Sequence, residues 1–241
     1  MKAIIKLILR RLGYDLVRYQ AFPSVSWNPL PLLIGEWATR QPNLQLVQIG
    51  ANDGGPTDPL RHAILKHQIT SLLIEPLPDI FERLNQNYAG VDHVRLAQYA
   101  VGPTDGTLIL WRVKPDSNLP SWTRELASFD RNHFAKFPIP NWRDQIEPIE
   151  VPMTSPTTLI TRHKLNSIDC LVIDTEGFDA KIVHAFLDSA IRPLLLVYEF
   201  FHVPIAERIS LRRRLFDLGY LTLDVGRDTQ AVHPSLAELI L

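Results

Sequence analysis

The sequence predicts an α/β protein built around a doubly wound, mainly parallel β-sheet with helices on both faces. Short apolar runs, typical of strands buried on both faces, alternate along most of the chain with segments of helical spacing. The length of 241 residues and the 46% content of hydrophobic residues suit one large globular domain. In such sheets ligands bind beyond the carboxyl ends of the strands, so functional residues are expected where strands end.

The first part of this pattern is a βαβ unit. Leu44–Ile49 and Ser71–Ile74 are apolar runs that predict two buried strands. Between them Asp58 is the expected N-cap of a helix, followed by a proline in the first helical position. A second helix is expected from Pro78, with apolar residues on one face, to a stop at Gly90.

The alternation then continues to the end of the chain. Further strands are expected at His93–Val101, Thr107–Val113, Cys170–Ile173, Leu194–Val197 and Leu221–Val225, with a short return near Ala231. The turn at Pro103–Gly106 predicts that Thr107–Val113 forms a hairpin with His93–Val101. Helices are expected around Ile182–Ala190 and Ile205–Leu218.

Residues 114–165 break the rhythm. They contain seven prolines interleaved with five Phe and Trp residues. Prolines suppress regular secondary structure, and the aromatic residues argue against disorder, so we expect an irregular, substrate-facing insertion that serves as a lid or acceptor-binding region. The expected organisation is an N-terminal helical segment, residues 1–43, followed by the main domain, residues 44–241.

Composition excludes several classes of protein. The 25 Lys and Arg residues balance 26 Asp and Glu residues, and the formal net charge of −1 makes a nucleic-acid partner a poor expectation. The one cysteine, Cys170, can form no internal disulfide and no structural zinc site. A reducing cytoplasm is therefore the expected location.

The first 20 residues differ from the rest because they are basic and amphipathic. Lys2, Lys6 and Arg10 recur at helical spacing, whereas Ile4, Leu7, Ile8 and Leu12 occupy another arc. We expect a helix that packs on the domain with its basic side in water. Peripheral contact with the inner face of the membrane through residues 1–20 is the alternative.

A glycine-rich turn follows the first predicted strand and reads Gln48-Ile49-Gly50-Ala51-Asn52-Asp53-Gly54-Gly55. A glycine here allows a sharp turn and close approach to a ligand. Glu75, at the end of the second strand, is placed to accept hydrogen bonds from both hydroxyls of a ribose. Asn52 stands where a dinucleotide site needs its second glycine, Asp53 would place a carboxylate where the pyrophosphate should lie, and no P-loop motif occurs. S-adenosylmethionine, which carries a sulfonium and an ammonium but no phosphate, suits the site better; the alternative is a plain βα turn with Glu75 in solvent.

Three stretches then point to a known family. They are Val47–Gly54, Leu73–Pro76 and Asp169–Asp179, and the strongest marker within them is Ile173-Asp174-Thr175-Glu176-Gly177. From about Leu44 to Gly226 the chain resembles the FkbM family of S-adenosylmethionine-dependent methyltransferases. The resemblance implies a class I, Rossmann-like fold with a seven-stranded sheet, and O-methylation of a sugar, glycan or natural-product precursor. The candidate cofactor-binding residues are Gly50, Ala51, Asn52, Asp53, Gly54, Glu75, Pro76 and Ala100.

Catalytic candidates lie near the ends of the later strands. A hydroxyl is a weak nucleophile until a base removes its proton, and histidine or a carboxylate can act as that base. His202 and the rival base His133 are the candidate histidines, and Asp174 and Glu176 are the candidate carboxylates. The candidates for substrate binding are Glu199 and Asp179; Asp179 can instead stabilise the N-terminus of its own helix.

A divalent cation held by the carboxylates is the alternative to a histidine base. The metal-free site is favoured because no histidine spacing typical of a transition-metal site occurs: His62 and His67 do not share a helix face. Two other functions stay open. They are a catalytically inactive cofactor-binding module associated with glycan-building enzymes, and an NAD-dependent oxidoreductase.

Overall fold

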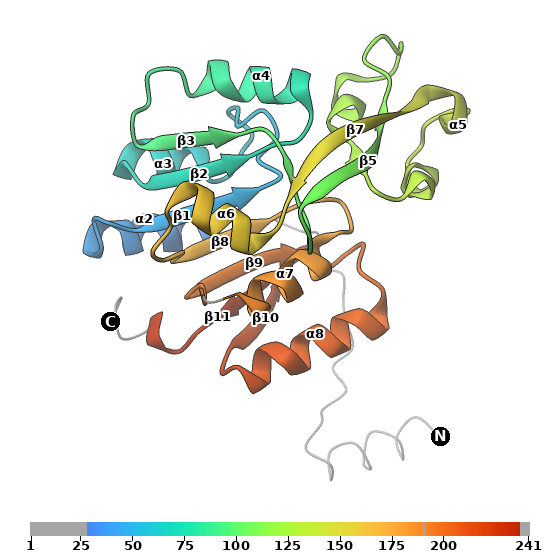
Figure 1. The fold of residues 1–241 in the computed structure, drawn as a ribbon. Coiled ribbons are helices and arrows are strands. Elements are labelled where there is room, and N and C mark those ends of the chain that lie inside the picture. Colours follow the sequence, from blue (N-terminus) through green and yellow to red (C-terminus); the bar gives the residue numbers. More distant parts are fainter. Residues whose placement is uncertain (1–27, 190, 237–241) are drawn as a thin grey trace, which may run out of the picture.

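The computed structural model describes residues 28–189 and 191–236, which form two β-sheets (Figure 1). The strands of the larger sheet are β1 (Gln45–Ile49), β2 (Thr70–Ile74), β3 (Val94–Ala97), β8 (Cys170–Ile173), β9 (Leu195–Glu199), β10 (Leu221–Val225) and β11 (Asp228–Val232). Their order is β10-β11-β9-β8-β1-β2-β3. Neighbours are parallel except where β11 pairs with β9 and β10. The predicted seven-stranded, mainly parallel sheet is confirmed.

Helices cover both faces of this sheet (Figure 1). On one face lie α2 (Leu30–Arg40), α3 (Arg61–His67) and α4 (Pro78–Asn87), and on the other lie α6 (Pro156–His163), α7 (Asp179–Asp188) and α8 (Ile205–Asp217). Side chains of a strand alternate between the two faces, so that Leu46 of β1 packs with Trp37 of α2, whereas Val47 shares a core with Phe186 of α7. The doubly wound arrangement explains why these strands are apolar on both sides.

A smaller sheet contains β4 (Ala100–Val101), β5 (Gly106–Val113), β6 (Ala127–Ser128) and β7 (Ile146–Thr154), in the order β4-β7-β5-β6. The prediction of one strand over His93–Val101 is wrong. A bend at Gln98 and Tyr99 separates β3 from β4 and buries the Tyr99 ring in the core of the larger sheet. The hairpin expected at Pro103–Gly106 is also absent from this described region, because β4 and β5 both pair with β7 and not with each other.

The prolines of residues 114–165 suppress regular structure only in part. Between β5 and β7 the segment forms the short helices η1 (Ser121–Glu125), η2 (Arg131–Lys136) and α5 (Trp142–Gln145), but β7 and α6 are regular despite three prolines. Pro148 and Pro152 lie in the part of β7 that pairs only with β5, so the other edge of the strand is open there. Because they are four residues apart, their backbone nitrogens point to the same edge, and at the open edge the N–H group that proline lacks is not needed. Pro156 is in the first turn of α6, where no N–H is needed, after the N-cap Ser155.

Two further expectations concern helix termini. The N-cap expected at Asp58 is wrong, because α3 begins at Arg61 and Asp58 lies three residues earlier. Asp58 Oδ1 instead accepts a hydrogen bond from Leu60 N at 2.8 Å in the turn before the helix. The basic helix expected within residues 1–20 lies outside the described residues. Within the described residues, no helix is long and apolar enough to cross a membrane.

A bidentate ion pair joins the two sheets. Arg112 of β5 is only 3% exposed, and its guanidinium contacts both carboxylate oxygens of Asp79 in the first turn of α4, with Nη2 and Oδ2 2.8 Å apart. Hydrogen bonding from Arg112 lowers the pKa of Asp79. The pair fixes the smaller sheet against the helix that follows β2.

We expect Asp79→Ala to lower the free energy of unfolding by about 3 kcal/mol, because it leaves the buried Arg112 charge without a partner. Urea denaturation of both proteins measures the difference. In the double variant Asp79→Ala/Arg112→Met the charge is absent, so much of the lost stability should return. An unchanged midpoint for Asp79→Ala would show that Arg112 is hydrated and that the pair is not a link between the sheets.

Candidate active site

A pocket lies at the carboxyl ends of the central strands, as the fold class predicts. It encloses about 730 Å³, part of it open to solvent, and is named here the strand-end pocket. The larger sheet contributes residues that follow β1, β2 and β8, and the smaller sheet closes the other side with Ala100, Leu110, Ala127 and Phe129. The smaller sheet is thus a wall of the pocket.

The turn after β1 brings the backbone of two strands together at the floor of this pocket. Gly50 has φ +79°, and the N–H groups of Gly50 and Ala51 both donate to the carbonyl oxygen of Ile74, at 2.9 and 3.0 Å. Asn52 follows with φ +49°, and its N–H donates to Glu75 Oε2 at 3.1 Å. The glycine-rich turn therefore places Glu75 directly beside the chain that leaves β1.

Glu75 is the most constrained acidic side chain of the pocket. It is 6% exposed, and its other oxygen accepts a hydrogen bond from Leu77 N at 2.9 Å. Burial raises the pKa of Glu75 to about 7, although hydrogen bonds from Leu77 and Asn52 act in the opposite direction. Each carboxylate oxygen accepts one backbone N–H and keeps a lone pair, so both can accept a hydroxyl of a ligand.

The predicted cofactor residues fall into two groups. Those that line the strand-end pocket are Gly50, Asn52, Glu75, Pro76 and Ala100. The other three support the turn from behind. Ala51 is buried in the core under α3, Gly54 packs against Leu84 and Tyr88, and Asp53 Oδ1 accepts a hydrogen bond from Gly55 N at 2.9 Å.

The pocket is acidic. Of the described residues that line it, four are carboxylic acids and none is lysine, arginine or histidine; the acids are Glu75, Glu125, Asp174 and Glu176. Asp174 is exposed to the open part of the pocket. Such a lining favours a cationic ligand and opposes a phosphate.

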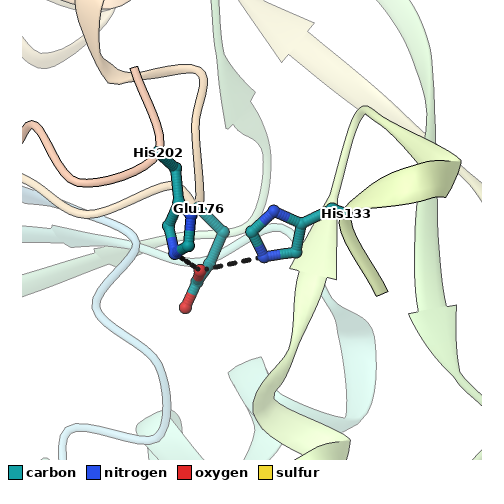
Figure 2. Close-up of side chains that lie close together, drawn as sticks. All are labelled: His133, Glu176 and His202. Carbon is teal, nitrogen blue, oxygen red and sulfur yellow. Dashed lines mark ion pairs between the residues drawn. The ribbon is translucent and has the colours of Figure 1, made fainter. Parts of the chain in front are cut away.

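Two histidines and one carboxylate meet at the edge of this pocket (Figure 2). Glu176, in the loop after β8, has Oε2 at 3.1 Å from His133 Nε2 and at 3.4 Å from His202 Nε2. His133 comes from η2 and His202 from the turn after β9, and their rings meet edge to face with centroids 4.6 Å apart. These three residues are called the His–Glu–His cluster.

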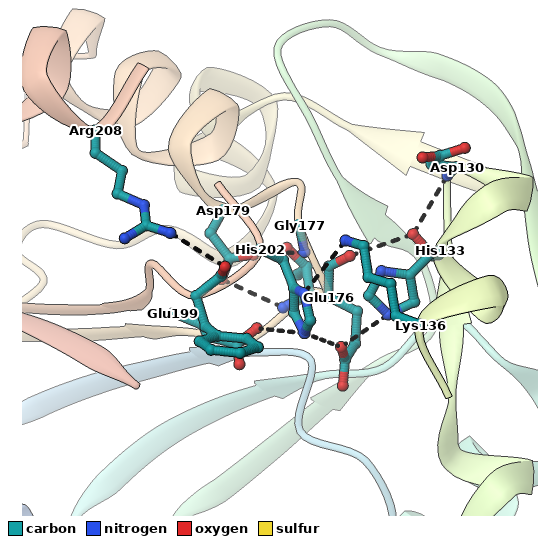
Figure 3. Close-up of polar contacts among 12 residues, drawn as sticks. Asp130, His133, Lys136, Glu176, Gly177, Asp179, Glu199, His202 and Arg208 are labelled. Carbon is teal, nitrogen blue, oxygen red and sulfur yellow. Dashed lines mark hydrogen bonds and ion pairs between the residues drawn. The ribbon is translucent and has the colours of Figure 1, made fainter. Parts of the chain in front are cut away.

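The loop that carries Glu176 is held by its own hydrogen bonds (Figure 3). Asp179, at the start of α7, is fully buried and accepts hydrogen bonds from the backbone of Thr175 and Gly177 and from the Thr175 hydroxyl, with distances of 3.0–3.4 Å. Ser128 Oγ of β6 donates to the Glu176 carbonyl at 3.2 Å. Glu176 itself has φ +54°, a strained conformation for a residue with a side chain. The fold therefore positions Glu176 at some conformational cost.

Burial changes the protonation of two neighbours in opposite directions. It lowers the pKa of His202 to about 4, so its imidazole is neutral near pH 7 and can accept a proton or bind a cation. Burial and the charges of Asp174 and Glu176 raise the pKa of Glu199 to about 9. Glu199 Oε2 is 3.8 Å from His202 Nε2, so this expected substrate-binding residue borders the His–Glu–His cluster.

The structure adds pocket residues that the sequence did not single out. Ile80 of α4 and Tyr99 of the bend between β3 and β4 line the pocket, and Glu125, Leu110 and Phe129 line it from the region of the smaller sheet. Phe129 also packs on Phe178, with ring centroids 4.2 Å apart. The aromatic content of residues 114–165 was the available signal, but it does not indicate which ring faces the pocket.

Comparison with known proteins gives one family match. A model of the methyltransferase FkbM domain matches residues 48–222 of the chain. No curated protein sequence matches it.

Several solved structures are distantly similar to this chain. An FkbM methyltransferase from Methylobacillus flagellatus KT is 12% identical with a TM-score of 0.46, over 79% of this chain and 44% of that one. The METTL16 methyltransferase domain is 13% identical with a TM-score of 0.45, over 96% and 78% of the two chains. A precorrin-6y C5,15-methyltransferase from Geobacter metallireducens GS-15 is 11% identical with a TM-score of 0.40, over 83% and 84%. The chain thus spans less than half the length of the first of these structures.

Proposed function

Since this chain belongs to the FkbM methyltransferase family, we propose that it transfers a methyl group from S-adenosylmethionine to a hydroxyl of a sugar or of a related glycan or natural-product precursor. The resemblance found in the sequence is confirmed at the level of the family, and the fold is that of the class I, Rossmann-like methyltransferases. The observation that carries the proposal is the acidic strand-end pocket, with Glu75 in its wall and the His–Glu–His cluster at its edge.

The residues of the pocket fit this cofactor. Glu75 has a free lone pair on each oxygen for the two ribose hydroxyls, and Gly50 and Asn52 form the turn beside it. Asp174 and Glu176 supply negative charge that would stabilise a sulfonium and an ammonium. When bound, S-adenosylmethionine supplies an activated methyl group on a cationic sulfur. An NAD pyrophosphate would instead meet four carboxylates with no basic side chain among the described lining residues.

Deprotonation of the acceptor is assigned to the His–Glu–His cluster. Hydroxyl groups need their proton removed in or before the transition state, and the cluster borders the pocket through Glu176. Neutral imidazole at His202 can accept that proton, or the cluster can hold a cation that lowers the pKa of the hydroxyl. Either route needs the acceptor oxygen beside Glu176, and Phe129 and Glu125 provide apolar and hydrogen-bonding surface for the rest of a sugar.

We expect Glu75→Ala to weaken binding of S-adenosylhomocysteine by about 100-fold or more, because the variant loses two charge-assisted hydrogen bonds with a net value of roughly 1.5–3 kcal/mol each. Isothermal titration calorimetry of wild type and variant measures this loss. NAD is titrated in parallel as the competing ligand.

Glu82→Gln, on the exposed side of α4, is the matched control and should bind S-adenosylhomocysteine like the wild type. Saturable binding of S-adenosylhomocysteine supports the cofactor assignment and justifies a panel of free sugars and sugar nucleotides as acceptors, with product S-adenosylhomocysteine quantified. Saturation by NAD alone would contradict the proposal and indicate an oxidoreductase. Binding of S-adenosylhomocysteine without turnover of any acceptor would favour the inactive module.

A further inference from the structure

Buried polar atoms converge beside the strand-end pocket without hydrogen-bond partners. His133 Nε2, Glu176 Oε2 and Glu199 Oε2 are each shielded from solvent, and although each lies within ion-pair distance of a neighbour, none makes a well-aligned hydrogen bond among the described residues. His133 is 2% exposed and Glu199 is 8% exposed. Unpaired buried polar atoms are rare because each costs about 1–3 kcal/mol, so a group of them that faces one point indicates a missing partner.

The distances within the His–Glu–His cluster fit a shared ion. A tetrahedral site with bonds of about 2.0–2.2 Å places its ligand atoms about 3.3–3.6 Å apart. Glu176 Oε2 lies 3.1 and 3.4 Å from the two Nε2 atoms, and one ligand atom from each residue lies within 4.8 Å of the others. Although the atoms are near each other, His133 Nε2 and Glu176 Oε2 are not in hydrogen-bond geometry.

We propose that His133, Glu176 and His202 bind a divalent transition-metal ion through two Nε2 atoms and one carboxylate oxygen. Imidazole nitrogens suit Zn²⁺, Fe²⁺ and Co²⁺, whereas Mg²⁺ and Ca²⁺ prefer oxygen ligands alone. Three protein ligands leave at least one coordination position for a further group, as in catalytic sites. Glu199 is the nearest further carboxylate, 3.8 Å from His202 Nε2.

The charges around the site favour a cation. Besides Glu176, the carboxylates that act on Glu199 are Asp174, Asp179 and Asp228. One contact opposes metal binding. Lys136 Nζ lies 3.4 Å from His202 Nδ1, and a donor there favours the tautomer with its hydrogen on Nε2. Lys136 is exposed, so its side chain can turn away when the ion binds.

Metal binding does not depend on the proposed function, but a role of the ion in activating the acceptor hydroxyl does rest on it. An acceptor hydroxyl on the open coordination position would have a lowered pKa and would lose its proton to water at the open side of the pocket. The histidines would then act as ligands, and neither would be the base. This arrangement also explains why two histidines share one carboxylate.

The test measures metal binding without cofactor or acceptor. Protein purified without a histidine tag and stripped with chelator is titrated with Co²⁺, which has visible absorption bands typical of tetrahedral nitrogen and oxygen coordination, and with Zn²⁺ by competition. We expect about one ion per chain, and an affinity at least about 100-fold lower in His133→Ala and in His202→Ala. Circular dichroism checks that the variants are folded.

Two further variants control the experiment. His62→Ala removes an exposed histidine of α3 and should bind the ion like the wild type, and Lys136→Ala should bind at least as tightly. If the wild type shows no Co²⁺ bands, or if His133→Ala and His202→Ala bind as it does, the metal site is wrong. The Co²⁺ titration of the wild type tests metal binding by itself, so the proposal can still be contradicted if a variant does not fold. Binding of S-adenosylhomocysteine without metal binding would overturn the site and leave the proposed function standing.

Discussion

Glu176→Gln is expected to lower kcat for methyl transfer by about 100- to 10,000-fold, the range typical of losing a group that promotes proton removal. Oε2 of Glu176 is the atom that both histidines approach, and an amide keeps the shape of the side chain but carries no negative charge. The variant can neither hold a cation firmly nor stabilise a protonated imidazole. Steady-state kinetics with an acceptor from the panel measure the effect.

The same variant should weaken binding of S-adenosylhomocysteine far less than it lowers kcat, because Glu75 is untouched and Asp174 remains to face the ammonium that this product keeps. Adding His202→Ala to Glu176→Gln should lower kcat little further if the His–Glu–His cluster acts as a unit. Losses that multiply would instead indicate independent roles for the two residues. A kcat close to that of the wild type would remove Glu176 from the chemistry altogether.

The larger sheet could be predicted from the sequence because its signal is local. Strands buried on both faces are continuous apolar runs, and the expected bounds Cys170–Ile173 coincide with the fully buried β8. The smaller sheet gives no such signal. Strand β7 has alternating exposed and buried residues and contains prolines, and it becomes a strand by pairing along its whole length with β5, far away in the sequence. Pairing between distant segments is not visible in either segment alone.

In the candidate site, too, some residues have a local signal in the sequence and others are brought together only by the fold. Glu75 could be named as a candidate from the sequence because it lies at a strand end beside the glycine-rich turn, and the structure places it in the wall of the strand-end pocket. His133 and His202 were named as rival bases, and the structure places both beside one carboxylate. Metal-ligand patterns in sequence rely on short spacing within one element, whereas the proposed ligands come from η2 and from the turns after β8 and β9. The absence of a short histidine spacing was therefore weak evidence against a transition metal.

The second large effect is expected for Gly50→Ala, which should lower the free energy of unfolding by about 4 kcal/mol or more. A Cβ at this position would lie 1.8 Å from the carbonyl oxygen of Asp174, and φ +79° adds a conformational penalty for any residue but glycine. The oxygen is a backbone atom at the end of the adjacent central strand, and the position of a Cβ is fixed by the backbone of residue 50, so no side-chain rotation can relieve the contact. Urea denaturation and the thermal midpoint measure the loss.

Gly90→Ala separates the two causes. Gly90 has φ +76°, nearly the same as Gly50, but a Cβ there would meet nothing within 4 Å, so this variant should show only the conformational penalty of about 1–2 kcal/mol. The difference between the two variants is then the effect of close packing between β1 and β8. Equal losses would mean that the strands can separate, and a folded Gly50→Ala protein should then bind S-adenosylhomocysteine less tightly, because Asp174 and the turn beside Glu75 would both have moved.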